Sequence, residues 1–224
     1  MLLAIDTATH TMSIALHDGT QLLAEQSWQA GKRQTTELAP AIQRMMALCK
    51  ATMTDLTAVA VSIGPGSYSG VRVGVAFAKG VADAHHLPLV GITTLDTLAY
   101  GQPYFQSGVG LITIVEAGRG KIIVQAYRWR KGMWHSRSEP RLMTWQMLLD
   151  TIDGEAYVTG DISQDALELL AKHDNVMIAP GAHWLRRAGY LAECALEKLR
   201  AAGDDQSAFA PANILPIYIQ GDIS

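Results

Sequence analysis

The sequence predicts an α/β protein built from two units that repeat one order of elements: three strands, then a helix, a strand, a helix and a strand. Short strand-like runs alternate with longer runs of helical period along the chain, and the order found in the first half recurs in the second. Of the 224 residues, 49% are hydrophobic and 17% are charged, so the chain has enough apolar material for two cores.

The first half opens with three short strands. Asp18-Gly19 separates the second strand from the third, because these residues tolerate the positive φ values of a tight hairpin turn. Thr35 or Thr36 is expected to cap the first helix, with Pro40 in its first turn, where a missing N–H leaves no acceptor unpaired. The expected strands are residues 2–6, 11–17, 20–27, 56–62 and 88–91, and the second helix covers 71–86.

The second half repeats this order. Thr144 and Ser163 are placed to cap two helices, and Gly203 to end a last helix at 183–202. The expected strands are residues 109–116, 121–129, 132–139, 156–159 and 175–179. The repeated order fits a duplicated ribonuclease-H-like β-β-β-α-β-α-β unit in the two-lobed actin-like (ASKHA) architecture. We expect the units at 1–100 and 101–224, with the last segment free to return to the first.

Charge and cysteine content limit the class of protein. The formal net charge is −3, which disfavours a protein drawn by its own overall field to phosphate backbones or to a membrane. Cys49 and Cys194 stand in apolar runs far apart, as expected for reduced core residues in the cytoplasm. The apolar run before Asp6 is too short for a signal sequence or a membrane span.

Three segments match a known family. They are Ala4-Ile5-Asp6-Thr7-Ala8-Thr9, Gly64-Pro65-Gly66-Ser67-Tyr68-Ser69-Gly70-Val71-Arg72-Val73-Gly74 and Gly91-Ile92-Thr93-Thr94-Leu95. Together they closely resemble the TsaB family, also called YeaZ, and the GPGSYSGVRVG run is the specific part. Gln34, Glu116 and Gly118 depart from the family pattern.

The resemblance implies a non-catalytic scaffold subunit, not an enzyme. Proteins of this family pair with a metal-bearing paralogue, TsaD, which transfers the threonylcarbamoyl group to the adenosine beside the anticodon of tRNA. An ATPase, TsaE, completes the set. The resemblance therefore implies that ATP or ADP and the metal belong to the partner subunits and that tRNA is met through the complex. The isolated chain is expected to form a homodimer, because a bare stripe of small residues flanked by methionines is unlikely to stay in water.

The residues themselves leave two enzymatic alternatives to the scaffold: a stand-alone actin-like ATPase or phosphotransferase, and a glycoprotease-type metallopeptidase. The second is disfavoured because no two of the seven histidines are three or four residues apart, so no His pair lies one helical turn apart to hold a metal. The first is disfavoured because Ala8 occupies the place where a glycine would let phosphate approach.

Three loops carry residues of a candidate anion site or vestigial nucleotide cleft. Glycines free the backbone for phosphate binding, and a helix N-terminus favours an anion. The alternative is a tight strand-to-helix connection capped by Ser69, with hairpins whose polar groups bind locally. The candidate residues are Asp6, Thr7, Thr9, Gly64, Gly66, Ser67 and Glu116.

The first two helices carry a candidate partner interface. Small residues recur every four positions at Gly70, Gly74, Ala78 and Ala82, so another helix could approach closely. The alternative is that this stripe packs on the protein's own sheet. The preceding helix is expected to add adaptable apolar side chains to the interface, at Leu38, Ile42, Met45 and Met46.

A basic hairpin is a candidate RNA contact. Arg128, Arg130, Lys131 and Arg137 are interleaved with tryptophans at 129 and 134, and arginine with aromatic side chains can clamp phosphates and stack bases. The alternative is a solvated edge whose charges prevent aggregation.

Overall fold

The computed structural model describes residues 1–104, 106 and 108–219. The chain divides into two compact units. The first contains Met1–Thr97 and Arg186–Ile217, and the second contains Leu98–Leu185 and resumes at Tyr218. Each unit is built on one sheet, and both sheets have the same strand arrangement.

The first sheet has the order β3-β2-β1-β4-β5. Its three N-terminal strands are antiparallel neighbours, and β4 and β5 continue the sheet in parallel from β1. The strands are β1 (Leu2–Asp6), β2 (Thr11–His17), β3 (Leu22–Gln29), β4 (Ala58–Ser62) and β5 (Leu89–Ile92).

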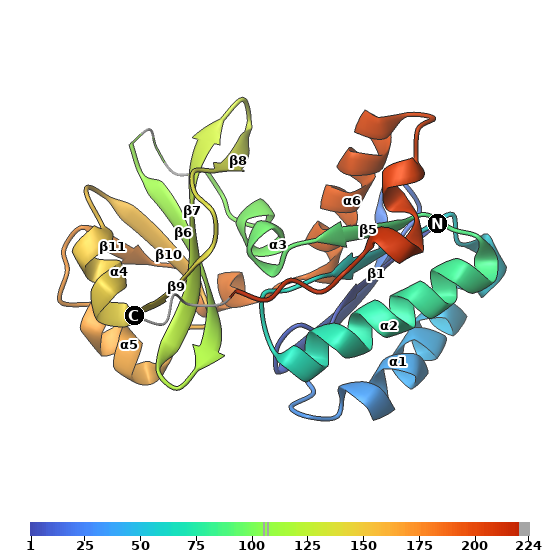
Figure 1. The fold of residues 1–224 in the computed structure, drawn as a ribbon, viewed down its shortest axis with the longest axis horizontal. Helices are drawn as coiled ribbons and strands as arrows, with labels where there is room; N and C mark the ends of the chain where they lie inside the picture. The colour runs from blue at the N-terminus through green and yellow to red at the C-terminus, as the bar shows by residue number, and fades with distance from the viewer. Residues whose placement is uncertain (105, 107, 220–224) are drawn as a thin grey trace. The chain divides into compact units, whose positions relative to one another are not determined.

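Helices cover both faces of this sheet (Figure 1). Helices α1 (Gln34–Leu48) and α2 (Tyr68–His85) pack on the face that carries Leu3 and Ile5 of β1. Helix α6 (Ala188–Ala202) packs on the opposite face, which carries Leu2 and Ala4. Side chains alternate along a strand, so a strand buried on both faces is continuously apolar, as β1 is.

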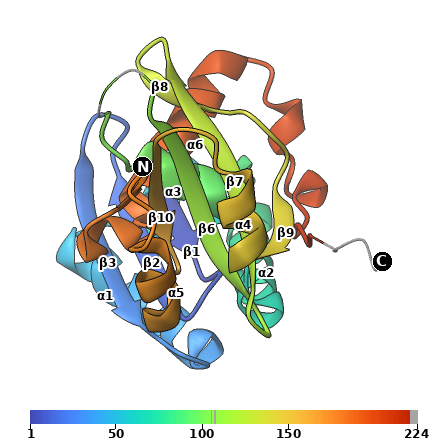
Figure 2. The same cartoon turned by 90° about the vertical axis from the view of Figure 1, so that its left-hand side faces the viewer.

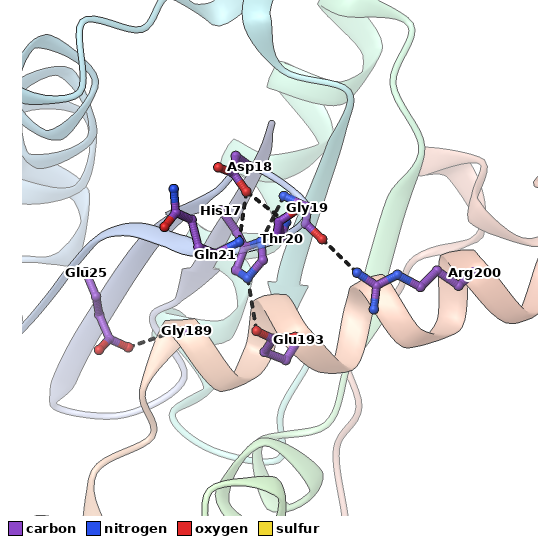
Figure 3. Close-up of polar contacts among 9 residues, drawn as sticks. All are labelled: His17, Asp18, Gly19, Thr20, Gln21, Glu25, Gly189, Glu193 and Arg200. Atoms are coloured by element: carbon purple, nitrogen blue, oxygen red, sulfur yellow. Dashed lines mark hydrogen bonds and ion pairs between the residues drawn. The ribbon is translucent and has the colours of Figure 1, made fainter.

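Helix α6 belongs to the first unit, which is the return of the last segment that the expected division at residue 100 left open. Figure 3 shows how this helix is attached to the first sheet. The Glu25 carboxylate on β3 accepts hydrogen bonds from the Arg187 Nε–H at 2.8 Å and from the Gly189 N–H at 2.7 Å. The Glu25 carboxylate of β3 thus lies at the N-terminus of α6, where negative charge is stabilising.

A second attachment joins α6 to the β2–β3 turn (Figure 3). His17 is buried; its Nδ1 accepts the Gly19 N–H at 3.0 Å and its Nε2 lies 3.0 Å from Glu193 Oε1. Because Nδ1 accepts a hydrogen bond, the proton of a neutral His17 ring is on Nε2, which donates to Glu193. Arg200 Nη2 donates to the Gly19 carbonyl at 2.7 Å.

The second sheet has the order β11-β10-β6-β7-β8, with β9 also paired to β7. Figure 2 views it with α4 (Trp145–Thr151) and α5 (Gln164–Leu170) in front of the sheet. The strands are β6 (Gly110–Gly118), β7 (Lys121–Arg130), β8 (Met133–Ser136), β9 (Arg141–Thr144), β10 (Ala156–Gly160) and β11 (Val176–Ile178). The duplicated α/β unit that the sequence predicts is confirmed by the matching orders.

Four shorter segments and one helix complete the described chain. Helix α3 (Thr94–Tyr100) follows β5, and 3₁₀ turns occupy Met53–Asp55, Gly181–Trp184, Ser207–Phe209 and Pro211–Asn213. No helix in this part of the chain is both long and apolar enough to span a bilayer.

Two of the helix caps predicted from the sequence are confirmed, and one is wrong. The Thr144 and Ser163 side chains cap α4 and α5 as expected. The expected Thr35 or Thr36 cap is wrong, because α1 begins at Gln34 and its N-cap residue, Arg33, makes no side-chain cap. Pro40 therefore lies inside the helix.

The strand expected at 132–139 is shorter, at Met133–Ser136 (β8), and a further strand, Arg141–Thr144 (β9), follows outside the expected range. The Arg137 N–H still donates to the Ala126 carbonyl, after which the chain leaves the β7 ladder and rejoins it as β9. Pro140, which has no N–H to donate, lies in the interruption.

Candidate functional site

The loop after β1 lies directly against the start of α2. A Cβ atom at Gly66 would be 2.1 Å from the Ala8 carbonyl oxygen, and one at Gly70 would be 2.3 Å from the Thr7 carbonyl oxygen. A Cβ at Gly74 would be 2.3 Å from Thr7 Oγ1. Glycine is required at 66 and 70 because two stretches of backbone approach each other more closely than a Cβ allows, and at 74 because the Thr7 side chain fills the space.

Hydrogen bonds within the chain occupy the polar groups of this contact. The Ser67 N–H donates to the Ala8 carbonyl at 2.6 Å, and the Gly70 N–H donates to Ser67 Oγ at 3.3 Å. Thr7 Oγ1 donates to the Gly70 carbonyl at 2.7 Å. Ser67, not Ser69, caps α2. The protein's own Ala8 carbonyl thus takes the amide that an anion would use at this helix N-terminus.

Asp6 and Thr9 are also hydrogen bonded to groups of the first unit. Asp6 is buried, and its Oδ1 accepts the Ala8 N–H at 2.8 Å. Thr9 Oγ1 is hydrogen bonded to the buried Arg186 guanidinium, and Gln34 Nε2 donates to the Thr9 carbonyl at 3.3 Å. Sequence reasoning did not include Arg186, since nothing in its local pattern links it to a loop 177 residues earlier.

The structure brings six of the seven cleft candidates into the first unit. Gly64 lies in the loop between β4 and α2, and its carbonyl accepts the Thr94 N–H at 2.8 Å. Glu116 belongs to the second unit, where its side chain is exposed and its N–H donates to Asp161 Oδ2 at 3.2 Å.

The predicted partner stripe on α2 faces the wrong way for an interface. Gly70, Gly74, Ala78 and Ala82 are buried against the sheet of their own unit, and Ala78 is 0% exposed. The four α1 residues expected beside them are also part of this core: Leu38, Ile42, Met45 and Met46. The contact between Gly74 and Thr7 explains the error, because the small residues admit the protein's own loop.

The opposite side of α2 is exposed and also carries small residues. Two residues along a helix correspond to a rotation of about 200°, so Ala76 lies opposite the buried Gly74 and Ala78. Ala76, Gly80 and Ala84 are exposed and spaced by four, and a Cβ at Gly80 would meet nothing within 4 Å. We call Ala76, Gly80 and Ala84 the outer stripe.

The basic hairpin separates its two residue types onto two faces. Cross-strand partners share a face, and Trp129 pairs with Trp134 while Arg128 pairs with His135. The tryptophans therefore lie on one face and the arginines on the other. The expected clamp of interleaved arginines and aromatic rings is wrong.

The described residues form no candidate metal site and no disulfide. Among them no group of three or more His, Cys, Asp or Glu residues is placed to hold a metal ion. Cys49 and Cys194 are both free thiols. Burial raises the pKa of the Cys194 thiol far above its ordinary value, so this group stays protonated at neutral pH.

Comparison with known proteins places the chain in a family. A family model described as "TsaD: tRNA N6-adenosine threonylcarbamoyltransferase" matches residues 28–155, more than half of the chain. The chain is similar to the tRNA threonylcarbamoyladenosine biosynthesis protein TsaB of Escherichia coli, at 27% identity over 100% of this chain and 96% of that protein. It is 35% identical to TsaB of Bacillus subtilis over 59% of this chain and 57% of that protein.

The fold has a close match among solved structures. YeaZ from Pseudomonas aeruginosa superimposes with a TM-score of 0.78 over 97% of this chain and 99% of that chain, at 20% identity. At that identity the likeness bears on the fold alone. The family model, the two TsaB relatives and the shared duplicated fold agree, and the chain belongs to the TsaB (YeaZ) family.

Proposed function

We propose that this protein serves in the biosynthesis of threonylcarbamoyladenosine in tRNA, as a non-catalytic cytoplasmic subunit. In this proposal it pairs with a TsaD-type transferase, which holds the metal, and acts with the ATPase TsaE. The TsaB relatives are described by their names as biosynthesis proteins for this modified nucleoside.

The observation that carries the non-catalytic role is the closed loop contact at the start of α2. The Ser67 N–H, which would otherwise point at a phosphate, donates to the Ala8 carbonyl, and Gly66 has no room for anything larger than hydrogen on that side. A nucleotide would have to displace the end of β1 and the loop after it, where Asp6 and Thr7 are both 1% exposed. This arrangement favours a scaffold over a stand-alone ATPase or phosphotransferase.

The outer stripe of α2 is the proposed pairing surface. Ala76, Gly80 and Ala84 leave the helix backbone open to a partner helix, and half-buried Val73 and Phe77 lie beside them. Close approach of two helices over small residues gains dispersion contacts along their length. In the isolated chain the same surface is expected to pair with a second copy.

The test is a single substitution in the middle of the outer stripe. Gly80→Trp should leave the chain folded, because nothing lies within 4 Å of the new Cβ. It should weaken pairing with TsaD by about tenfold or more, since overpacking costs about 1–3 kcal/mol and 1.4 kcal/mol is tenfold in affinity. Co-purification with TsaD and nucleoside mass spectrometry in a bacterial strain depleted of its own TsaB would measure both effects.

Gly80→Ala is the matched control and should pair and modify normally. Ala78→Trp should instead lose the folded protein, because Ala78 is 0% exposed. A wild-type chain that does not restore the modified nucleoside would refute the proposed function. Normal pairing by Gly80→Trp would refute only the pairing surface.

A further inference from the structure

The arginines of the second unit form one line on one face of its sheet. Antiparallel partners share a face, and so do residues two apart along a strand. The successive rungs along β7 are Arg130 with Met133, Arg128 with His135, Ala126 with Arg137, and Val124 with Arg141. Each rung contributes one arginine, and at about 7 Å per rung the line is about 20 Å long.

Arg137 and Arg141 are placed beside β7 by different backbone contacts. The Arg137 N–H donates to the Ala126 carbonyl at 2.8 Å, which continues the β7–β8 ladder by one rung. Arg141 lies on β9, which pairs with β7 beyond the interruption. We call Arg128, Arg130, Arg137 and Arg141 the arginine row.

The positive charge of the arginine row is not compensated nearby. Residues 128–141 contain four arginines and one lysine but a single acid, Glu139, in a chain of net charge −3. All four arginines are exposed, and none makes an ion pair with a residue in the described ranges 1–104, 106 and 108–219. Four unpaired cations in a line favour an extended anionic ligand.

The neighbouring aromatic rings are engaged inside the unit. The Trp129 ring lies 5.1 Å from the Tyr104 ring and 5.3 Å from the Trp134 ring, centroid to centroid. The Trp134 indole N–H donates to the Gln102 carbonyl at 3.1 Å. These rings are on the face away from the arginine row, so the row can contact phosphates without stacking bases.

We propose that the arginine row binds the phosphate backbone of a structured RNA, which under the proposed function is tRNA. Guanidinium groups match phosphate oxygens in a two-pronged geometry that lysine lacks. Arg128 and Arg130 lie on the β7–β8 hairpin, which extends past α4 and α5 (Figure 2), and Arg137 and Arg141 continue the line toward β9; a line suits a strand backbone more than a flat membrane. Contacts of this kind fix position and carry no base specificity.

The test measures binding of an unmodified tRNA transcript to the purified chain by fluorescence anisotropy. Arg128→Glu with Arg130→Glu should weaken binding at about 50 mM salt by about tenfold and lower the salt-dependence slope by about two. Lys121→Glu with Lys172→Glu is the control, because both lysines are exposed in the same unit and the net charge changes equally. The control should bind almost as wild type does.

Several results would overturn the inference. They are no binding of tRNA by the wild-type chain at low salt, equal weakening by the two double variants, and a tenfold preference for one base sequence. Tighter binding to vesicles of anionic phospholipid or to polyglutamate than to tRNA would also overturn it. Gly80→Trp should bind RNA normally, so failure of the pairing proposal and failure of the arginine row give different patterns.

Discussion

Three glycines in the first unit show how single residues decide whether the fold can close. The loop after β1 touches the turn before α2 through Ala8 at Gly66, and it touches α2 itself through Thr7 at Gly70 and Gly74. Thr7 is held in place because its Oγ1 donates to the Gly70 carbonyl at 2.7 Å. A side chain at any of these glycines would therefore meet a group that cannot easily move.

Two substitutions in α2 test this at the residue scale. Gly74→Ala should destabilise the first unit, because its Cβ would be 2.3 Å from Thr7 Oγ1. Gly80→Ala should stabilise it, because its Cβ meets nothing within 4 Å and alanine favours the helix. Urea unfolding should separate the two variants by about 2 to 4 kcal/mol. Equal stabilities would mean that Thr7 does not hold its place against α2.

At the scale of elements, several side-chain hydrogen bonds attach α6 to the first sheet. Its first turn is held by Glu25 of β3, and the carboxylate raises the pKa of Arg187 by hydrogen bonding and charge. Its later turns are held by the His17–Glu193 contact and by Arg200 (Figure 3). The apolar side of α6 packs on Ala-rich positions of the sheet, which let the helix lie close.

Loss of the Glu25 carboxylate should loosen α6. Glu25→Ala leaves the buried Gly189 N–H without its acceptor, and such an unpaired group costs about 1–3 kcal/mol. Hydrogen exchange should increase first in residues 188–202. Glu168→Ala, at an exposed position on α5, should change stability by less than about 0.5 kcal/mol. Unchanged exchange in α6 would mean that Glu25 does not anchor it.

At the scale of the whole molecule, the first unit is discontinuous in sequence. Residues 1–97 supply five strands and two helices, but within the described residues the α6 face of the sheet is covered by the segment Arg186–Ile217. Leu2, Ala4, Ala15 and Val90 belong to the core beneath α6. The second unit is inserted between the parts of the first.

A truncated chain tests this dependence. A chain that ends at residue 185 keeps every strand of the first sheet but exposes its α6 face, so its first unit should not fold stably. Heteronuclear NMR should show dispersed signals from residues 98–185 and collapsed signals from residues 1–97. Dispersed signals from both units would contradict the role given to α6.

The sequence by itself determined the elements and their repeated order. β1 and β2 match their expected ranges, and the Thr144 and Ser163 caps lie where expected, since such features depend on residues within a turn or two. The family motifs in the first half also depend on local sequence. Only the register of β7 with β8 and β9 placed four arginines on one face, because pairing is a property of two strands. Only the tertiary structure decided that the α2 stripe of Gly70 to Ala82 is buried, because periodicity identifies a helical face but not the surface it meets.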